Sequence, residues 1–127
     1  MIPASWSPVE RDDGERVGWL DDEGGPRTLL GTPLDVAPGA DPRAALVAQG
    51  LAAVDGRWFA RLPSDLDATT DARSPDDDWA WRAVVVVEVS ATACRIRLRF
   101  APPDQLTVLL ELPVPVGDLL RREPPAG

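Results

Sequence analysis

Four amino-acid types are missing from this sequence of 127 residues: it contains no histidine, tyrosine, lysine or asparagine. Without histidine, the chain lacks the commonest general base, the Ser-His and Cys-His nucleophile arrangements and histidine-based metal sites. The single cysteine, Cys94, cannot form an internal disulfide or a zinc ribbon within the chain. We therefore expect no catalytic residues, no metal site and no cofactor, and we interpret Cys94 as a small core residue.

Long hydrophobic runs are also missing, because the longest wholly apolar segments span only a few residues. This excludes a membrane-spanning helix, which needs about 20 consecutive apolar residues. The opening residues, MIPASWSPVE, contain neither the basic nor the apolar region of a secretory signal. Together with the lone thiol, these absences predict a cytoplasmic protein.

Positive charge is scarce, since 13 arginines face 21 acidic residues and the net charge is −8. Such a chain repels phosphates, which argues against general binding to nucleic acid or to anionic membranes. The acidic excess is concentrated in one segment, because residues 64–78 carry one arginine and six aspartates. We expect the partner to be a protein with a basic surface.

The first half of the sequence predicts short strands followed by one helix. Turn signals at Asp13–Gly14 and in the segment DDEGGP predict a three-strand meander over about residues 5–31. Asp41 before a proline is typical of a helix start, so the segment PRAALVAQ should be helical, with Gly50 as a left-handed terminator. Residues 57–62 follow a further turn and indicate another strand.

Two segments have compositions typical of irregular structure. Residues 63–78 are rich in proline, serine, threonine and aspartate, and they predict a flexible acidic loop. Residues 121–127 predict a disordered tail. The whole chain, 1–127, is predicted to be a single domain, because it is long enough to bury a core of its own.

Apolar residues alternate in three segments of the last third of the chain, a pattern typical of antiparallel strands. A hairpin that turns through residues 91–94 would place Val85, Val87 and Val89 on one buried face. The complete predicted face consists of Val85, Val87, Val89, Ile96, Leu98, Phe100, Val108 and Leu110. On this register, Val87→Ala should lower the free energy of unfolding by about 1–3 kcal/mol.

The predicted fold class is therefore α+β. We expect mostly antiparallel β-structure, with about six to seven short strands in meanders and one short helix. A partly open barrel is one arrangement that these strands can adopt.

Three arginines, Arg95, Arg97 and Arg99, alternate with apolar residues in the segment CRIRLRF. In the predicted register, Glu111 lies opposite Arg95 and Glu88 lies opposite Arg97, while Arg99 has no acidic partner. The stripe is therefore interpreted mainly as an ordinary solvent face.

Trp79 and Trp81 share the predicted buried face, and we interpret them as packing at one end of the core. The alternative is an aromatic clamp, since same-face side chains two residues apart stand about 7 Å apart on a strand. With Arg95, Arg97 and Arg99, such a clamp would make a small β-barrel-like module that binds an anionic ligand or single-stranded nucleic acid.

The face opposite the predicted core carries Val84, Val86 and Leu109 beside Arg99, and it is therefore too apolar for an ordinary solvent face. A cover must come from the helix of the same chain, from the N-terminal meander or from a partner. Our main hypothesis is a small, acidic, non-enzymatic binding or accessory protein of inhibitor, immunity or accessory-subunit type, which docks on another protein through these four residues. A third hypothesis, a carboxylate-based hydrolase, would need two acids that converge in a pocket.

Overall fold

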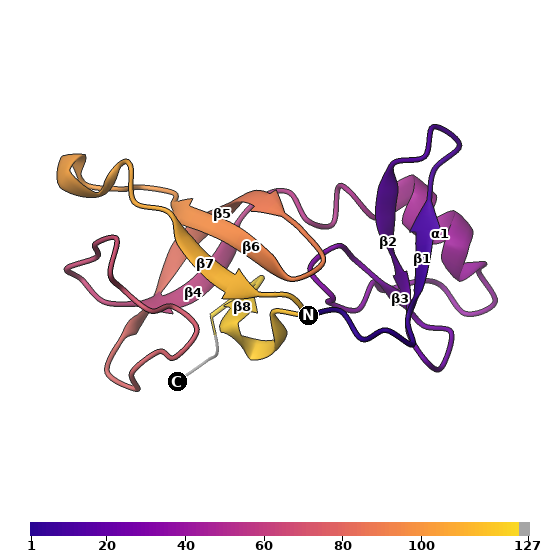
Figure 1. The fold of residues 1–127 in the computed structure, drawn as a ribbon, viewed down its shortest axis with the longest axis horizontal. Helices are drawn as coiled ribbons and strands as arrows, with labels where there is room; N and C mark the ends of the chain where they lie inside the picture. Colours follow the sequence, from indigo (N-terminus) through magenta and orange to yellow (C-terminus); the bar gives the residue numbers. More distant parts are fainter. Residues whose placement is uncertain (125–127) are drawn as a thin grey trace.

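The computed structural model describes residues 1–124, and in this part of the chain the strands form two antiparallel sheets with one short α-helix (Figure 1). The predicted α+β fold is therefore confirmed, but neither sheet of these residues closes into a barrel. The elements are β1 (Ser7–Glu10), β2 (Arg16–Leu20), β3 (Pro26–Arg27), α1 (Pro42–Gln49), β4 (Trp58–Leu62), β5 (Ala80–Val89), β6 (Ala93–Leu98), the 3-10 helix η1 (Pro103–Gln105), β7 (Leu110–Pro113), the 3-10 helix η2 (Gly117–Leu119) and β8 (Leu120–Arg121).

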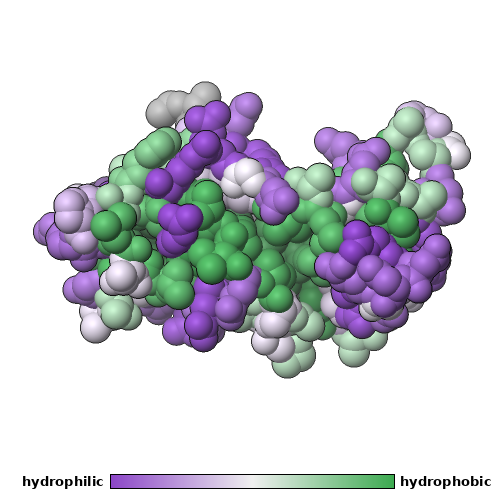
Figure 2. Space-filling model, turned by 90° about the horizontal axis from the view of Figure 1, so that it is seen from above, coloured by the Kyte–Doolittle hydropathy of each residue, from purple (hydrophilic) through white to green (hydrophobic). Residues whose placement is uncertain are grey.

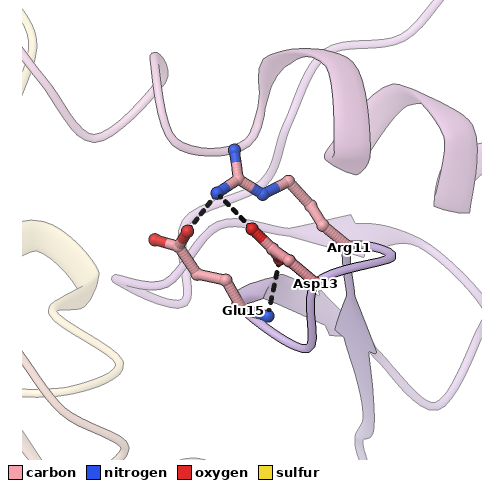
Figure 3. A network of polar contacts seen from close by, with 3 residues as sticks. All are labelled: Arg11, Asp13 and Glu15. Atoms are coloured by element: carbon pink, nitrogen blue, oxygen red, sulfur yellow. Dashed lines mark hydrogen bonds and ion pairs between the residues drawn. The ribbon is translucent and has the colours of Figure 1, made fainter.

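The first sheet is the predicted meander of β1, β2 and β3, and its turns depend on short acidic side chains. Between β1 and β2, Gly14 adopts a φ of +86°, which favours glycine. Arg11 donates to the carboxylates of Asp13, at 3.3 Å, and of Glu15 (Figure 3). The Glu15 amide also donates to Asp13 Oδ1 at 3.0 Å. The acids of this turn are thus engaged in the hydrogen bonds that build it.

Helix α1 packs on the first sheet and buries one large side chain there. It begins as predicted, because Asp41 accepts a hydrogen bond from the Arg43 amide at 3.2 Å. Leu46 is fully buried against β1 and β2. The prediction of a left-handed Gly50 is wrong, since this residue has φ −59° and ψ −44°. Glycine is needed there for space, because a Cβ would lie 2.5 Å from the Val17 carbonyl oxygen.

The second sheet contains five strands in the order β7-β6-β5-β4-β8. One face of it is apolar and buried, and in β4 and β6 every second residue lies on this inner face. The other face, the outer face, carries the residues between them. The strand residues of the main core are Trp58, Ala60, Leu62, Val84, Cys94, Ile96, Leu98, Leu110, Leu112 and Leu120.

The predicted pairing of β5 with β6 is wrong by three residues over most of β5, an odd shift that exchanges the two faces of the strand. Val84 lies opposite Leu98, and Val86 lies opposite Ile96. Val84 is fully buried and Val86 packs against the main core, so the even-numbered valines face inward. The expectation that they face outward is therefore wrong. Both faces of β5 are apolar, so the alternation of the sequence does not determine whether its odd-numbered or its even-numbered residues face the core.

A β-bulge between Val86 and Glu88 reverses the alternation near the end of β5. Beyond the bulge, Val89 pairs with Cys94 and again packs against the main core. Val87 is 48% exposed. The burial on which the predicted cost of Val87→Ala depends is therefore missing, and a smaller cost is expected.

The connection from β6 to β7 departs from the predicted hairpin. Residues 99–109 leave the sheet and include η1, so Phe100 does not pair with Leu106 as predicted. Two prolines in this segment lack the N–H that a strand ladder needs. Closer to the first sheet the prediction holds, since Glu111 lies opposite Arg95.

The N-terminal unit (residues 1–56, with the first sheet and α1) packs end to end with the C-terminal unit (residues 57–124, with the second sheet), as Figure 1 shows. Ile2 and Leu30 of the N-terminal unit are buried in the main core. The Val116 amide also donates to the Leu30 carbonyl at 3.1 Å. One core therefore runs through both units.

Arg121 and Arg122, the first two residues of the predicted disordered tail, make specific contacts with the rest of the fold. Arg121 belongs to β8, and the Arg122 guanidinium donates to the Asp55 carbonyl at 2.7 Å. Arg122 also stacks on Trp58, with its Cζ 3.9 Å from the ring centroid. The rest of that prediction, residues 125–127, lies outside the described residues.

The predicted acidic loop, residues 63–78, is irregular but anchored at several points. Leu66 and Ala72 are buried in the main core. The Gln105 side chain, from η1, donates to the Ser64 carbonyl at 3.0 Å. The loop therefore contributes to the core and contacts the β6–β7 connection.

Candidate functional site

The four residues predicted to bind a partner separate in the structure. Val84 has no exposed surface and Val86 is half-buried, so neither contributes to an outer apolar face. Leu109 is 44% exposed and Arg99 is exposed, and both belong to the β6–β7 connection. The exposed candidate residues therefore lie on the β6–β7 connection and not on the face of the sheet.

We call Phe100, Leu106 and Leu109 the distal tip. Their exposed fractions are 78%, 61% and 44%. The connection that carries them extends beyond the sheet at the end of the molecule farthest from the N-terminal unit (Figure 1). Pro102 and Pro103 lead into η1, and their fixed φ angles restrict the backbone of this connection. The distal tip is therefore a set of exposed apolar side chains on a connection whose backbone is conformationally restricted.

Two ionised carboxylates of the acidic loop, Asp67 and Asp71, form what we call the acidic rim. Leu109 and Asp71 line the same groove, which has a volume of about 480 Å³. Hydrogen bonds from the Thr69 hydroxyl and amide, at 2.5 and 2.8 Å, hold the pKa of Asp67 below its ordinary value. The Arg73 guanidinium and amide likewise lower the pKa of Asp71. Both carboxylates thus remain charged at neutral pH, and Asp71 shares its groove with Leu109 of the distal tip.

The two tryptophans of the alternative hypothesis do not form a clamp. Trp79 precedes β5 and lines a pocket with Pro63 and Arg82. Trp81 pairs with Arg61 of β4 and lies on the outer face. Both rings are half-buried, but neither packs against the main core, so the predicted core cap is also wrong.

Arg95 and Arg97 lie on the outer face, as predicted, whereas Arg99 begins the β6–β7 connection, and the acidic partners of the stripe differ from those predicted. Arg95 Nε lies 3.5 Å from Glu88 Oε1, because the register of β5 on β6 places Glu88 opposite Arg95 instead of Arg97. Glu111 flanks Arg95 from the other neighbouring strand. Within residues 1–124, no carboxylate forms an ion pair with Arg97 or Arg99. These two cations therefore remain available on an otherwise acidic molecule.

Two arginines that the sequence analysis missed lie over Trp81. The Cζ atoms of Arg61 and Arg121 are 5.1 and 5.5 Å from the centroid of the Trp81 ring. Arg61 alternates with buried residues in β4, and this alternation is a signal for an outward position. The sequence gives no comparable signal for Arg121, which reaches the ring only because β8 pairs with β4.

The structure describes the surroundings of the single thiol and of the acidic side chains in residues 1–124. Cys94 is buried, and burial raises the pKa of its thiol to about 11. The thiol therefore stays protonated at neutral pH and is a poor nucleophile. In residues 1–124, histidine, cysteine and carboxylate side chains do not gather in threes as a metal site would require. No helix of this part combines the length and apolar character needed to cross a membrane.

Comparison with known proteins returned no family model, no curated protein and no solved structure that matches the chain. Function must therefore be inferred from the residues of the distal tip, the acidic rim and the outer face.

Proposed function

We propose that this protein is a non-enzymatic docking protein that binds another protein through the distal tip and the acidic rim. The carrying observation is the exposure of three large apolar side chains on one connection, at 78%, 61% and 44%. Exposed apolar residues that gather on a surface are typical of interaction sites. The complementary partner surface is an apolar pocket bordered by arginine or lysine.

The distal tip has the composition of an interface centre. Phe100 offers an aromatic ring, and aromatic residues are enriched in such centres. Pro102 and Pro103 limit the backbone freedom of the connection, so less conformational entropy is lost on binding. The Arg99 guanidinium lies 5.5 Å from the centroid of the Phe100 ring and adds hydrogen-bond donors at the border.

The acidic rim favours a partner with a positively charged surface. Asp67 and Asp71 remain ionised, and the whole chain carries a net charge of −8. Such a field steers a basic partner toward the surface and raises the association rate at low ionic strength. Inhibitor, immunity and accessory-subunit roles all fit this chemistry. We place the role in a reducing cytoplasm, with which the free thiol of Cys94 is compatible.

Site-specific photo-crosslinking in cells tests the location of the surface. A photoreactive phenylalanine analogue replaces Leu106 in one variant and Val47 in a matched control, since Val47 is 45% exposed on α1. We expect one defined adduct from position 106 and none from position 47, and mass spectrometry of the adduct identifies the partner. The same adducts from both positions, or an adduct with a second copy of this chain, would contradict the proposal.

Calorimetry with the purified partner then tests the chemistry of the surface. Phe100→Ser should weaken binding by about tenfold or more, as expected for a central aromatic contact. Val47→Ser should leave the affinity unchanged. Asp67→Asn combined with Asp71→Asn should weaken binding, and the loss of affinity should be larger at low salt than at high salt. A Phe100→Ser variant that binds as tightly as the parent chain would exclude the distal tip.

A further inference from the structure

A second surface feature lies on the outer face of the second sheet, at the edge formed by β4 and β8. The distal tip lies toward the opposite edge, between β6 and β7. A pocket of about 250 Å³ opens at the β4–β8 edge. It is lined by Arg61, Pro75, Trp81, Asp118, Leu119 and Arg121. None of these residues belongs to the distal tip or the acidic rim.

Two guanidinium groups converge on one aromatic ring in this pocket. Arg61 comes from β4 and Arg121 from β8, and their Cζ atoms lie 5.1 and 5.5 Å from the Trp81 centroid. Contact with the ring orients the planar guanidinium groups, whose donors suit the oxygens of a carboxylate or phosphate. Arg121 Nε is buried and has no hydrogen-bond partner within residues 1–124.

The carboxylates that pair with these arginines are held weakly. Asp77 Oδ1 lies 3.6 Å from Arg61 Nη1, and Asp118 Oδ1 lies 3.4 Å from Arg121 Nη2. Both aspartate side chains are almost fully exposed, at 104% and 94%. Ion pairs of this kind are screened by water and contribute little free energy. An anionic ligand can therefore displace either carboxylate at small cost.

We infer that this pocket binds a small anion with a flat apolar body. The anionic group takes the place of the Asp77 and Asp118 carboxylates between the guanidinium groups of Arg61 and Arg121. The apolar body packs against Trp81 and its neighbours in the pocket wall. The pocket volume of about 250 Å³ admits a single substituted ring, not a large cofactor.

The apolar wall distinguishes this site from a simple anion site. Pro75 from the acidic loop and Leu119 from η2 are half-buried beside the half-buried Trp81. These three side chains shield one side of a ligand from water, and an apolar ring buried there gains affinity. The net charge of −8 opposes any anion, but salt screens that field over about 8 Å at physiological ionic strength. The two guanidinium groups act at contact distance and are screened much less.

A nuclear magnetic resonance titration tests the inference directly. The probe is phenyl phosphate, and inorganic phosphate and phenol each carry one of its two features. The signal is the indole N–H of Trp81, assigned by its loss in Trp81→Phe. We expect phenyl phosphate to bind at least about tenfold more tightly than either single-feature probe. Equal binding of phenyl phosphate and inorganic phosphate would overturn the site as inferred.

Paired substitutions supply changes of opposite sign. Arg61→Gln and Arg121→Gln should each weaken phenyl phosphate binding by about tenfold. Asp77→Asn combined with Asp118→Asn should strengthen it by about two- to fivefold, because the competing carboxylates are lost. Arg73→Gln is the matched control, since Arg73 also pairs with an exposed aspartate but lies outside the pocket.

The fold of each variant is verified by its thermal unfolding midpoint. The aspartate variants distinguish a loss of binding from a loss of folding. Their side chains are exposed, and their removal should increase the affinity, which misfolding cannot do. The inference fails if both aspartate and arginine variants bind like Arg73→Gln.

A single-stranded tetrathymidylate separates a small ligand from a nucleic acid. We expect it to bind no more tightly than phenyl phosphate and to be insensitive to Arg97→Gln. Tighter binding that falls as strongly with Arg97→Gln as with Arg121→Gln would mean that nucleic acid lies along the whole outer face. That result would overturn the small-ligand site.

Discussion

Among residues 1–124, the main core contains 17 buried residues, most of them from the C-terminal unit. The separate cluster of the N-terminal unit consists of Val9, Val17 and Leu46. A cluster of three side chains is small for a sheet and a helix to bury alone. The N-terminal unit also contributes Ile2, Leu30 and Val54 to the main core. The stability of the N-terminal unit therefore depends on the C-terminal unit more than the stability of the C-terminal unit depends on the N-terminal unit.

Charge separates the two units as well. Residues 1–56 carry four arginines against ten acids, and residues 57–124 carry nine arginines against eleven acids. On the face shown in Figure 2, hydrophobic residues gather along the C-terminal unit and into the middle of the molecule, and a large hydrophilic cluster lies on the N-terminal unit. Acids such as Asp13 and Asp21 accept hydrogen bonds within turns of the N-terminal unit. Turn hydrogen bonds there support a sheet that has little burial of its own.

The largest effect should come from Ile96→Ala in the main core. Ile96 is fully buried, so the change should lower the free energy of unfolding by about 2–5 kcal/mol. Urea denaturation measures the loss, and hydrogen exchange should show faster exchange of amides in both units. An N-terminal unit that kept its protection in this variant would mean that it is stable alone.

Leu46→Ala should have a smaller and more local effect of about 2–3 kcal/mol. Amides of β1 and β2 should exchange faster, while those of β5 and β6 keep their protection. The thiol of Cys94 in β6 gives a chemical check, because its pKa of about 11 keeps it protonated at pH 8. Labelling of Cys94 should accelerate in Ile96→Ala but not in Leu46→Ala. Equal acceleration in both would show that the dependence of the units is mutual.

Acid should weaken the N-terminal unit through Asp21. Hydrogen bonds from the amide of Gly25 at 2.8 Å and from Arg27 Nε at 3.0 Å lower the pKa of this carboxyl from 3.8. The stabilisation is therefore fully present above pH 3.8 and is lost as pH falls through the lower pKa of the folded state. Asp21→Asn removes this titration, so the stability difference between parent and variant should shrink on acidification. A difference that is independent of pH below 3.8 would contradict the assigned cause.

The smallest effect should come from Val87→Ala, at about 0.5 kcal/mol or less, because Val87 is 48% exposed. Val86→Ala is the matched substitution on the inner side, and it should cost about 1 kcal/mol. Thermal unfolding of the two variants measures the difference. A larger cost for Val87→Ala would place the bulge elsewhere in β5.

Elements with one apolar face could be predicted from the sequence, and β5 shows why others could not. Arginines occupy one face of β6, so only one orientation buries apolar residues there, and Cys94, Ile96 and Leu98 are buried as predicted. In β5, both Val84 and Val85 lie in an unbroken run of valines. The choice between the two faces depends on neighbouring strands and on a bulge, which no local alternation reveals.

The residues of the candidate sites could be predicted only in part, for a similar reason. Arg99 and Leu109 were identified, but Phe100 was expected inside because its parity matches that of Ile96 and Leu98. Its exposure follows from the way the connection leaves the sheet. The position of Arg121 beside Trp81 depends on the pairing of β8 with β4, a contact between distant segments that composition and periodicity do not encode.

The pairing of β4 with β8 also bears on how the chain is synthesised. Ala60 pairs with Leu120, so a ribosome that adds roughly 5–20 residues per second exposes one edge of β4 for about 3–12 s before its neighbour exists. An open strand edge is a template for other chains during that interval. Arg122 donates a hydrogen bond to the carbonyl of Asp55, a residue that precedes β4. Because Arg122 follows β8 in the sequence, this contact can form only after β8 has been synthesised. A nascent chain halted before residue 120 would thus present β4 to chaperones or to other copies of itself.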